Sequence, residues 1–323
     1  MAQEYENSTT NMPRNANTLC IEACRADDVS LMEQALAMAA EPNSRFTAQQ
    51  VAQLGLSRSA SRRAVHVLKY LVDHLHDADI AALTPGQITT NEDMGKPSLE
   101  VLEILVAHGW DINTPGVGST LLWDVVTYHD LVKWCLDHGA KVDIPDYQPE
   151  VIGNVTRRNH MPRPTILGAA ASQGSIETLE LLAEHMAPLD PRTLHLAVER
   201  ATILAPREGE EPSPSYTERL DMIRHLIDVA GLDVNAREPK VGSTCNTALC
   251  IAVGRLNHQN FQELVDVLMD RGADPNLNCK TQEDAPGWPS AMVCAETHGT
   301  KKFLQAAMDR QAEKQGEKRG DTD

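Results

Sequence analysis

Two short phrases that recur in a fixed order constrain the fold of this chain more than any other feature. The first is an apolar phrase that opens a helix, at residues 120–126 (TLLWDVV), 192–198 (RTLHLAV) and 247–253 (TALCIAV). The second closes a helix and enters a turn, at residues 105–113 (LVAHGWDIN), 136–143 (LDHGAKVD), 226–235 (LIDVAGLDVN) and 268–276 (LMDRGADPN). Such self-similarity predicts stacked units, each burying its apolar side against the next.

Each unit is expected to contain two helices. Residues 165–190 divide around Gly174 into a small apolar helix and an amphipathic one, with Ile176, Leu179 and Leu182 on the buried side. Gly109, Gly139 and Gly272 are predicted to end second helices in the left-handed conformation. The Asp or Asn residues that follow are typical of tight turns.

The pattern T-x-L-x-x-A followed by L-L-x-x-G-A-D-x-N resembles the ankyrin repeat, a β-turn and two antiparallel helices of about 33 residues. The resemblance implies an all-α ankyrin-repeat solenoid of about eight helix pairs with short turns. The expected units span residues 18–40, 44–80, 84–113, 120–143, 165–190, 191–235, 247–276 and 288–309. Met186 departs from the family pattern, because it stands at the glycine position. Residues 83–86 (LTPG) and the long insertions also resemble divergent ankyrin proteins of filamentous fungi.

The domain organisation follows from these units. We expect a disordered N-terminal segment over residues 1–17, a continuous ankyrin-repeat array over 18–309 and a polar C-terminal tail over 310–323. Two insertions rich in proline, at 144–164 and 206–216, are expected to form loops. Glu208, Glu210 and Glu211 in the second could meet a basic partner or remain a solvated run.

Charge and cysteine content restrict the partners and the compartment. Lys and Arg number 29 against 46 Asp and Glu, a net charge of −17, which argues against nucleic acid as a partner. Residues 1–17 contain no apolar run typical of a signal peptide, and no stretch is apolar enough to span a membrane. We therefore expect a monomer in the cytoplasm or nucleus. The seven cysteines lack a C-x-x-C pair and are expected to be mostly buried small side chains.

Several residues could bind a metal but have a structural explanation. His74, His108, His138 and His185 recur at one position, the end of a second helix, where a ring can bond terminal carbonyls. The cluster of His74, His76, Asp77 and Asp79 lies where the family has a turn. The pairs Cys20/Cys24 and Cys294/His298 each share a helix face, without further ligands in view. We predict no metal and no cofactor.

Three of the four tryptophans, Trp110, Trp123 and Trp134, lie close together in the sequence with Tyr128. Trp110 replaces a small residue after a glycine, and Trp123 stands at the His position of the first-helix phrase. Such large side chains either fill an altered core or project as interface anchors. The sequence leaves both interpretations open.

The function hypothesis is a noncatalytic protein-interaction module, because none of the common catalytic motifs is present. The resemblance implies partner contacts on the turns and first helices. The candidate partner-binding residues are Trp110, Asp111, Asn113, Trp123, Tyr128, Asp143, Asn235 and Asn276. His195, the counterpart of a family histidine, is expected to bond a neighbouring turn. The alternative is an enzyme or small-molecule-binding protein with an aromatic pocket in the groove.

Overall fold

The structure, a computed structural model, describes residues 15–74, 78–90, 95–116, 119–142, 164–189, 192–238, 246–254, 260–277 and 290–320. It divides into two compact units, residues 1–125 and 126–323. The continuity of the array from residue 18 to 309 stays a prediction. The first insertion (144–164), Asp143, His76, Asp77, Cys245 and Cys279 lie outside the described residues, except for Pro164.

The first unit contains seven α-helices and one 3-10 helix over its described residues. These are α1 (Ala16–Ala26), α2 (Val29–Ala39), α3 (Ala48–Arg62), α4 (Val65–His74), η1 (Ile80–Ala82), α5 (Pro85–Thr89), α6 (Leu99–Ala107) and α7 (Leu121–Asp124). Helix α1 packs against α2 and α3, α4 packs against α3 and α6, and α5 packs against α3 and α7. Successive first helices therefore lie side by side, as a repeat stack requires.

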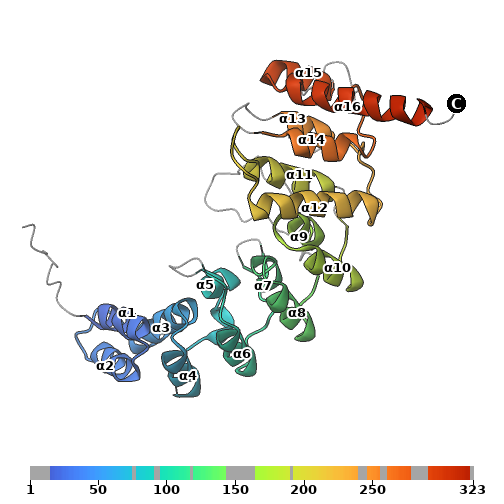
Figure 1. The fold of residues 1–323 in the computed structure, drawn as a ribbon. Coiled ribbons are helices and arrows are strands. Elements are labelled where there is room, and N and C mark those ends of the chain that lie inside the picture. The colour runs from blue at the N-terminus through green and yellow to red at the C-terminus, as the bar shows by residue number, and fades with distance from the viewer. Residues whose placement is uncertain are drawn as a thin grey trace, which may run out of the picture. The chain divides into compact units, whose positions relative to one another are not determined.

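The second unit contains nine α-helices over its described residues. These are α8 (His129–Asp137), α9 (Ile166–Gln173), α10 (Ile176–Glu184), α11 (Thr193–Leu204), α12 (Pro214–Asp228), α13 (Ala248–Val253), α14 (Gln262–Met269), α15 (Ala291–His298) and α16 (Lys301–Gly320). Figure 1 shows the pairs from α9–α10 to α15–α16 lying one upon another. Each of these pairs packs against the next one along the chain.

The all-α prediction is confirmed. The described residues form 16 α-helices and no strand, with one isolated β-bridge between Arg237 and Thr247. Each of the eight predicted repeats contains two successive α-helices, including the first two repeats, which were predicted mainly from amphipathic runs. In the last two predicted repeats, only α16 extends beyond the predicted range, because it ends at Gly320 and not at residue 309.

Short polar side chains determine where most of the helices begin. The side-chain oxygen of the residue before the first turn accepts a backbone N–H of that turn, which would otherwise lack an intrahelical partner. Such caps are formed by Asn15, Asp28, Thr47, Ser98, Thr165, Ser175, Ser213, Thr247 and Ser290. The Thr of the recurring first-helix phrase is therefore a start signal, as at Thr165 and Thr247.

The predicted left-handed glycines end second helices as expected. Gly109, Gly139 and Gly272 have φ of 91°, 84° and 87°. At the first of these, the Trp110 amide donates to the Leu105 carbonyl (2.9 Å) and the Gly109 amide to the Val106 carbonyl (3.0 Å), which completes a Schellman motif. The helix thus stops where an L side chain would be strained.

Met186 adopts the same left-handed conformation, with φ of 59°, although it is not a glycine. Its side chain is 86% exposed, so few contacts compensate for the backbone strain. We expect Met186→Gly to raise the free energy of unfolding by about 0.5 to 1 kcal/mol, after allowing for the greater freedom of glycine in the unfolded chain. Urea denaturation measures this. Gly139→Ala, the matched control, should lower stability, and a loss of stability in Met186→Gly would contradict the account.

Aliphatic side chains and thiols form the core. Of the seven cysteines, the five that the structure describes are buried thiols, which confirms the prediction for Cys20, Cys24, Cys135, Cys250 and Cys294. Burial raises the pKa of the Cys135 thiol to about 12. At neutral pH this cysteine is therefore a protonated, unreactive core residue.

The two ends of the array differ from the sequence expectation. Helix α1 begins at Ala16, capped by Asn15, inside the segment predicted as disordered. Helix α16 continues to Gly320, where the sequence predicted a frayed tail from residue 310. The reason lies in two polar side chains: Arg310 pairs with Asp266, and Gln311 donates to the Met269 carbonyl, so both bind this helix to α14.

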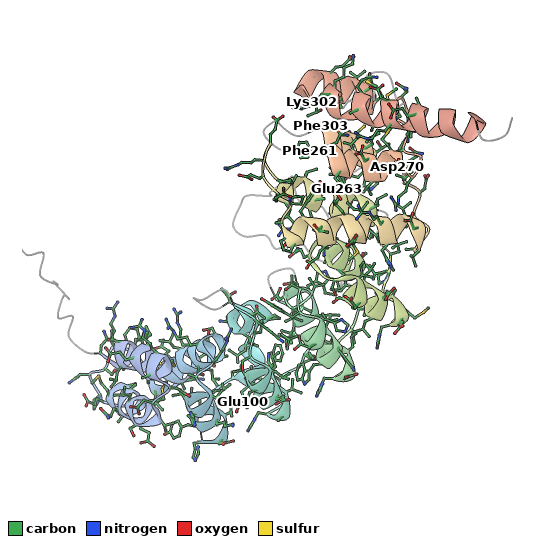
Figure 2. The ribbon with its side chains drawn as sticks, in the orientation of Figure 1. Glu100, Phe261, Glu263, Asp270, Lys302 and Phe303 are labelled. Atoms are coloured by element: carbon green, nitrogen blue, oxygen red, sulfur yellow. The ribbon has the colours of Figure 1, made fainter. Side chains whose placement is uncertain are left out.

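The second insertion is shorter than predicted, because α12 already begins at Pro214. Its residues contact later repeats: the Asn260 amide donates to the Pro206 carbonyl (2.7 Å), and Lys302 Nζ lies 3.4 Å from Glu208 Oε1. Figure 2 shows Lys302 and Phe303 beside Phe261. The Phe261 and Phe303 rings meet edge to face at 6.0 Å. Glu208 thus has a partner within the chain.

Candidate functional site

The turns that follow the second helices have one repeated geometry. Asp111 Oδ1 accepts the Asn113 amide at 2.9 Å, Asp233 Oδ1 accepts the Asn235 amide at 2.9 Å, and Asp274 Oδ1 accepts the Asn276 amide at 2.8 Å. The carboxylate of each Asp-x-Asn segment therefore holds its own turn. Asp111 and Asn276 are exposed, and Asn113 is half-buried. These side chains are presented on a fixed backbone.

The side-chain amide of Asn235, a candidate partner-binding residue, bonds the following repeat. Its Nδ2 donates to the Gly272 carbonyl (2.9 Å), and its Oδ1 accepts the Asp274 amide (2.8 Å). Both amide atoms thus bond the turn of the following repeat, 37 and 39 residues away. Asn235 joins two repeats, and its polar atoms are occupied there.

We therefore expect Asn235→Ala to lower the free energy of unfolding by about 1 to 2 kcal/mol, because two hydrogen bonds between repeats are lost. Asn276→Ala is the matched control: its side chain is exposed, and the turn is held by its backbone amide instead. That variant should change stability by less than about 0.5 kcal/mol. Equal losses in chemical denaturation would contradict the role given to Asn235.

Trp110, a candidate partner-binding residue in the sequence, is buried in the structure. Its side chain is 2% exposed, and its Nε1 donates to the Leu83 carbonyl at 2.8 Å. Leu83 lies in the short segment between η1 and α5, and the indole of Trp110 contacts this segment. Of the two interpretations that the sequence left open, the altered core therefore holds for this tryptophan.

The other aromatic candidates are only partly buried. Trp123 on α7 and Tyr128, the residue before α8, are each half-buried. Trp134 is half-buried as well, and its ring stacks on His138 with centroids 4.2 Å apart. Trp123 and Tyr128 stay candidate contact residues, whereas Trp134 makes an aromatic contact with the residue that follows its own helix.

The recurring histidines bond helix carbonyls, as predicted. In each, Nδ1 meets the carbonyl oxygen four residues earlier, at 3.1 Å in His74, 2.7 Å in His108, 2.8 Å in His138 and 2.8 Å in His185. His195 Nε2 lies 3.1 Å from the Ala236 carbonyl, which confirms the expected bond to a turn. The repeated bond to a helix carbonyl explains why histidine recurs at this position, and no metal-ligand role is needed to explain it.

His108 also links two repeats, because its Nε2 lies 2.9 Å from Asp73 Oδ1 on α4. The hydrogen bond to Ile104 and the contact with Asp73 raise the pKa of His108 against the effect of burial. The charged ring therefore stabilises the fold below its ordinary pKa of about 6.5, and this contribution is lost as pH rises through the raised value. We expect the urea midpoint to fall more between about pH 5.5 and pH 8.5 in the wild type than in His108→Gln. Parallel pH profiles would contradict this.

The described residues contain neither a cluster of metal ligands nor a membrane-spanning helix. No three His, Cys, Asp or Glu side chains gather there as a metal site would require. Cys294 Sγ lies 3.7 Å from His298 Nδ1, so this pair does share a face, and the ring also bonds the Cys294 carbonyl at 2.9 Å. No described helix combines the length and the apolar character needed to cross a bilayer.

The geometry therefore defines a class of protein: helix pairs stacked along the chain, with repeated turns between them. Residues 244–280 match the family model described as ankyrin repeat. None of the curated proteins matches the chain. Among solved structures, an ankyrin repeat domain from Acinetobacter baumannii matches with 17% identity over 89% of this chain and 96% of that one, at a TM-score of 0.28. A TM-score this low does not establish a common arrangement.

The matched segment contains α13 and α14 with the turn that ends at Asn276. Each of these features recurs elsewhere in the described residues: a Thr cap at Thr165, left-handed helix ends at Gly109 and Gly139, and Asp-x-Asn turns at 111–113 and 233–235. The family match covers this one repeat, and the recurring local geometry supports ankyrin repeats in the rest of the described chain. Repeats of this family generally act as protein–protein interaction modules.

Proposed function

We propose that this protein is a noncatalytic interaction module that binds a protein partner through the turns and first helices of its repeats. The observation that carries the proposal is the self-supported Asp-x-Asn turn. Because Asp111 and Asp274 hold their own turns, the exposed side chains of Asp111 and Asn276 are presented without further ordering. Such preorganisation lowers the entropic cost of binding.

The proposed contact residues are Asp111, Asn113 and Trp123 in the first unit and Tyr128 and Asn276 in the second, with Asp143 as a sequence candidate outside the described residues. Trp and Tyr are typical binding anchors. We further propose a monomer that works in the cytoplasm or nucleus, where the five described thiols would remain reduced. The net charge of −17 supports a protein partner rather than a nucleic acid.

Affinity purification from extract of the source, followed by mass spectrometry, tests the proposal. Wild type should retain a specific partner, and Trp123→Ala should lose most of it. Trp134→Ala is the matched control, because that ring stacks on His138, the residue after α8, and is not among the proposed contact residues. Circular dichroism verifies that both variants are folded. The absence of any specific partner, or equal retention by Trp123→Ala, would overturn the proposal.

A further inference from the structure

Helices α1 and α3 run parallel and in register, which two thiol contacts establish. Cys20 Sγ donates to the Val51 carbonyl and Cys24 Sγ to the Gly55 carbonyl, each at 3.6 Å. Both contacts join residues 31 positions apart in the sequence. A residue of α1 therefore lies level with the residue of α3 that follows it by 31 positions. Figure 1 shows the two helices side by side.

This register brings arginines of the two helices together. Arg25, in the last turn of α1, lies level with Leu56 of α3. At a rise of 1.5 Å per residue, Arg58 lies about 3 Å and Arg62 about 9 Å further along the helix direction. Packed helices are about 8–10 Å apart, which the long arginine side chains can span. The three arginines therefore lie within about 9 Å of one another along the helix direction.

The electrostatics of the cysteine pair support this placement. The pKa of the Cys24 thiol is raised by its hydrogen bond with Cys20 and by burial, and the charges of Arg62 and Arg58 act against that rise. Both guanidiniums of α3 are thus close enough to act on a thiol of α1. Arg63 follows at the end of α3, where its Nη2 donates to the Lys96 carbonyl. We name Arg25, Arg58, Arg62 and Arg63 the arginine face.

The arginine face is positive within a strongly acidic chain. Helix α3 contains no Asp or Glu, and α1 contains one, Glu22. Among the other described acids of this unit, Glu33, Asp73, Glu100 and Glu103 lie on second helices. Asp27 and Asp28 directly follow α1, where the Asp27 carboxylate is bonded to His66 and Val67. Arg25 and Arg58 are exposed, and neither forms an ion pair with any carboxylate of the described residues.

Compensation of the helix dipoles explains only part of this surface. Arg25 and Arg62 are in last turns, where a cation is favourable. Arg58 lies before the last turn of α3, so the dipole does not account for it. A set of exposed guanidiniums is suited to carboxylates, which they bind by paired hydrogen bonds.

We propose that the arginine face docks an acidic segment of the protein partner, a stretch of chain rich in Asp and Glu. The inference rests on the proposed function and names the chemical class of the partner. Electrostatic complementarity of this kind increases the association rate and weakens as salt screens the charges. A net charge of −17 would otherwise repel such a segment.

A labelled poly-glutamate peptide tests the proposal by fluorescence anisotropy with the full chain. We expect the folded wild type to bind it at low salt and to release it as salt rises. Arg58→Gln should weaken binding about fivefold, since one exposed charge is removed. Arg224→Gln is the matched control on α12, where that guanidinium already pairs with Asp221 and Glu263. It should bind like wild type.

Failure to bind poly-glutamate at low salt would overturn the inference, as would equal weakening by Arg58→Gln and Arg224→Gln. The two proposals can fail separately. A captured partner that binds Arg58→Gln as well as it binds wild type would overturn the arginine face and leave the interaction function intact. Arg58-dependent binding of poly-glutamate, with no partner captured from extract, would support the face and count against the proposed function.

Discussion

Arg219→Met is expected to lower the free energy of unfolding by about 3 kcal/mol, one of the two largest effects among these predictions. Arg219 lies on α12, is 4% exposed, and donates to the carbonyls of Ala171 (2.8 Å) and Gly174. These carbonyls belong to the C-terminal end of α9, where no intrahelical amide follows to bond them. Replacement by methionine would leave both acceptors buried without this donor.

Chemical denaturation of purified protein measures the effect of Arg219→Met. Arg224→Met is the matched control on the same helix, since Arg224 forms its ion pairs at the surface with Asp221 and Glu263. Exposed pairs contribute little, so this variant should lose at most about 0.5 kcal/mol. Similar losses in both variants would show that the contact with α9 does not stabilise the stack.

Trp110→Ala is expected to cost about 4 kcal/mol, because truncating a buried tryptophan leaves a cavity. The indole is 2% exposed and also satisfies the Leu83 carbonyl. The unfolding midpoint in urea gives the loss. A stable Trp110→Ala that had lost only partner binding would instead support the original sequence prediction.

Trp110→Phe separates packing from hydrogen bonding at this position. Phenylalanine keeps most of the apolar volume but has no N–H for the Leu83 carbonyl. We expect a loss of about 1 to 2 kcal/mol, well below that of the alanine variant. Equal losses would mean that the hydrogen bond, rather than the volume, accounts for the stability.

The fold could be predicted from the sequence because its signals are local. Thr165 and Thr247 cap helices a few residues away, and Gly109 and Gly272 end them. The periodicity of the apolar residues predicts the helices between these signals. Each of the eight predicted repeats accordingly contains a pair of helices. The role of the recurring histidines could also be predicted, because the carbonyl that each ring bonds lies only four residues earlier, as with His138 and Trp134.

The candidate site was less predictable, because the contacts that matter join distant repeats. Asn235 was expected to face a partner, and its acceptor at Gly272 lies 37 residues away. Trp110 meets a carbonyl 27 residues earlier. Arg219 interrupts an apolar face on α12, and only the carbonyls 45 and 48 residues earlier explain it. The exposed Asp111 and Asn276 keep the position that the turn pattern predicted.

Methyl–methyl NOE measurements in the second unit test the central claim, that each helix pair is covered by its neighbours along the chain. We predict contacts between α9 and α11, between α11 and α13, and between α13 and α15, in agreement with the packing of these helices. We predict none between α9 and α15. Strong contacts between α9 and α15, or cross-strand amide patterns across these helices, would contradict a repeat stack and the interaction surface inferred from it.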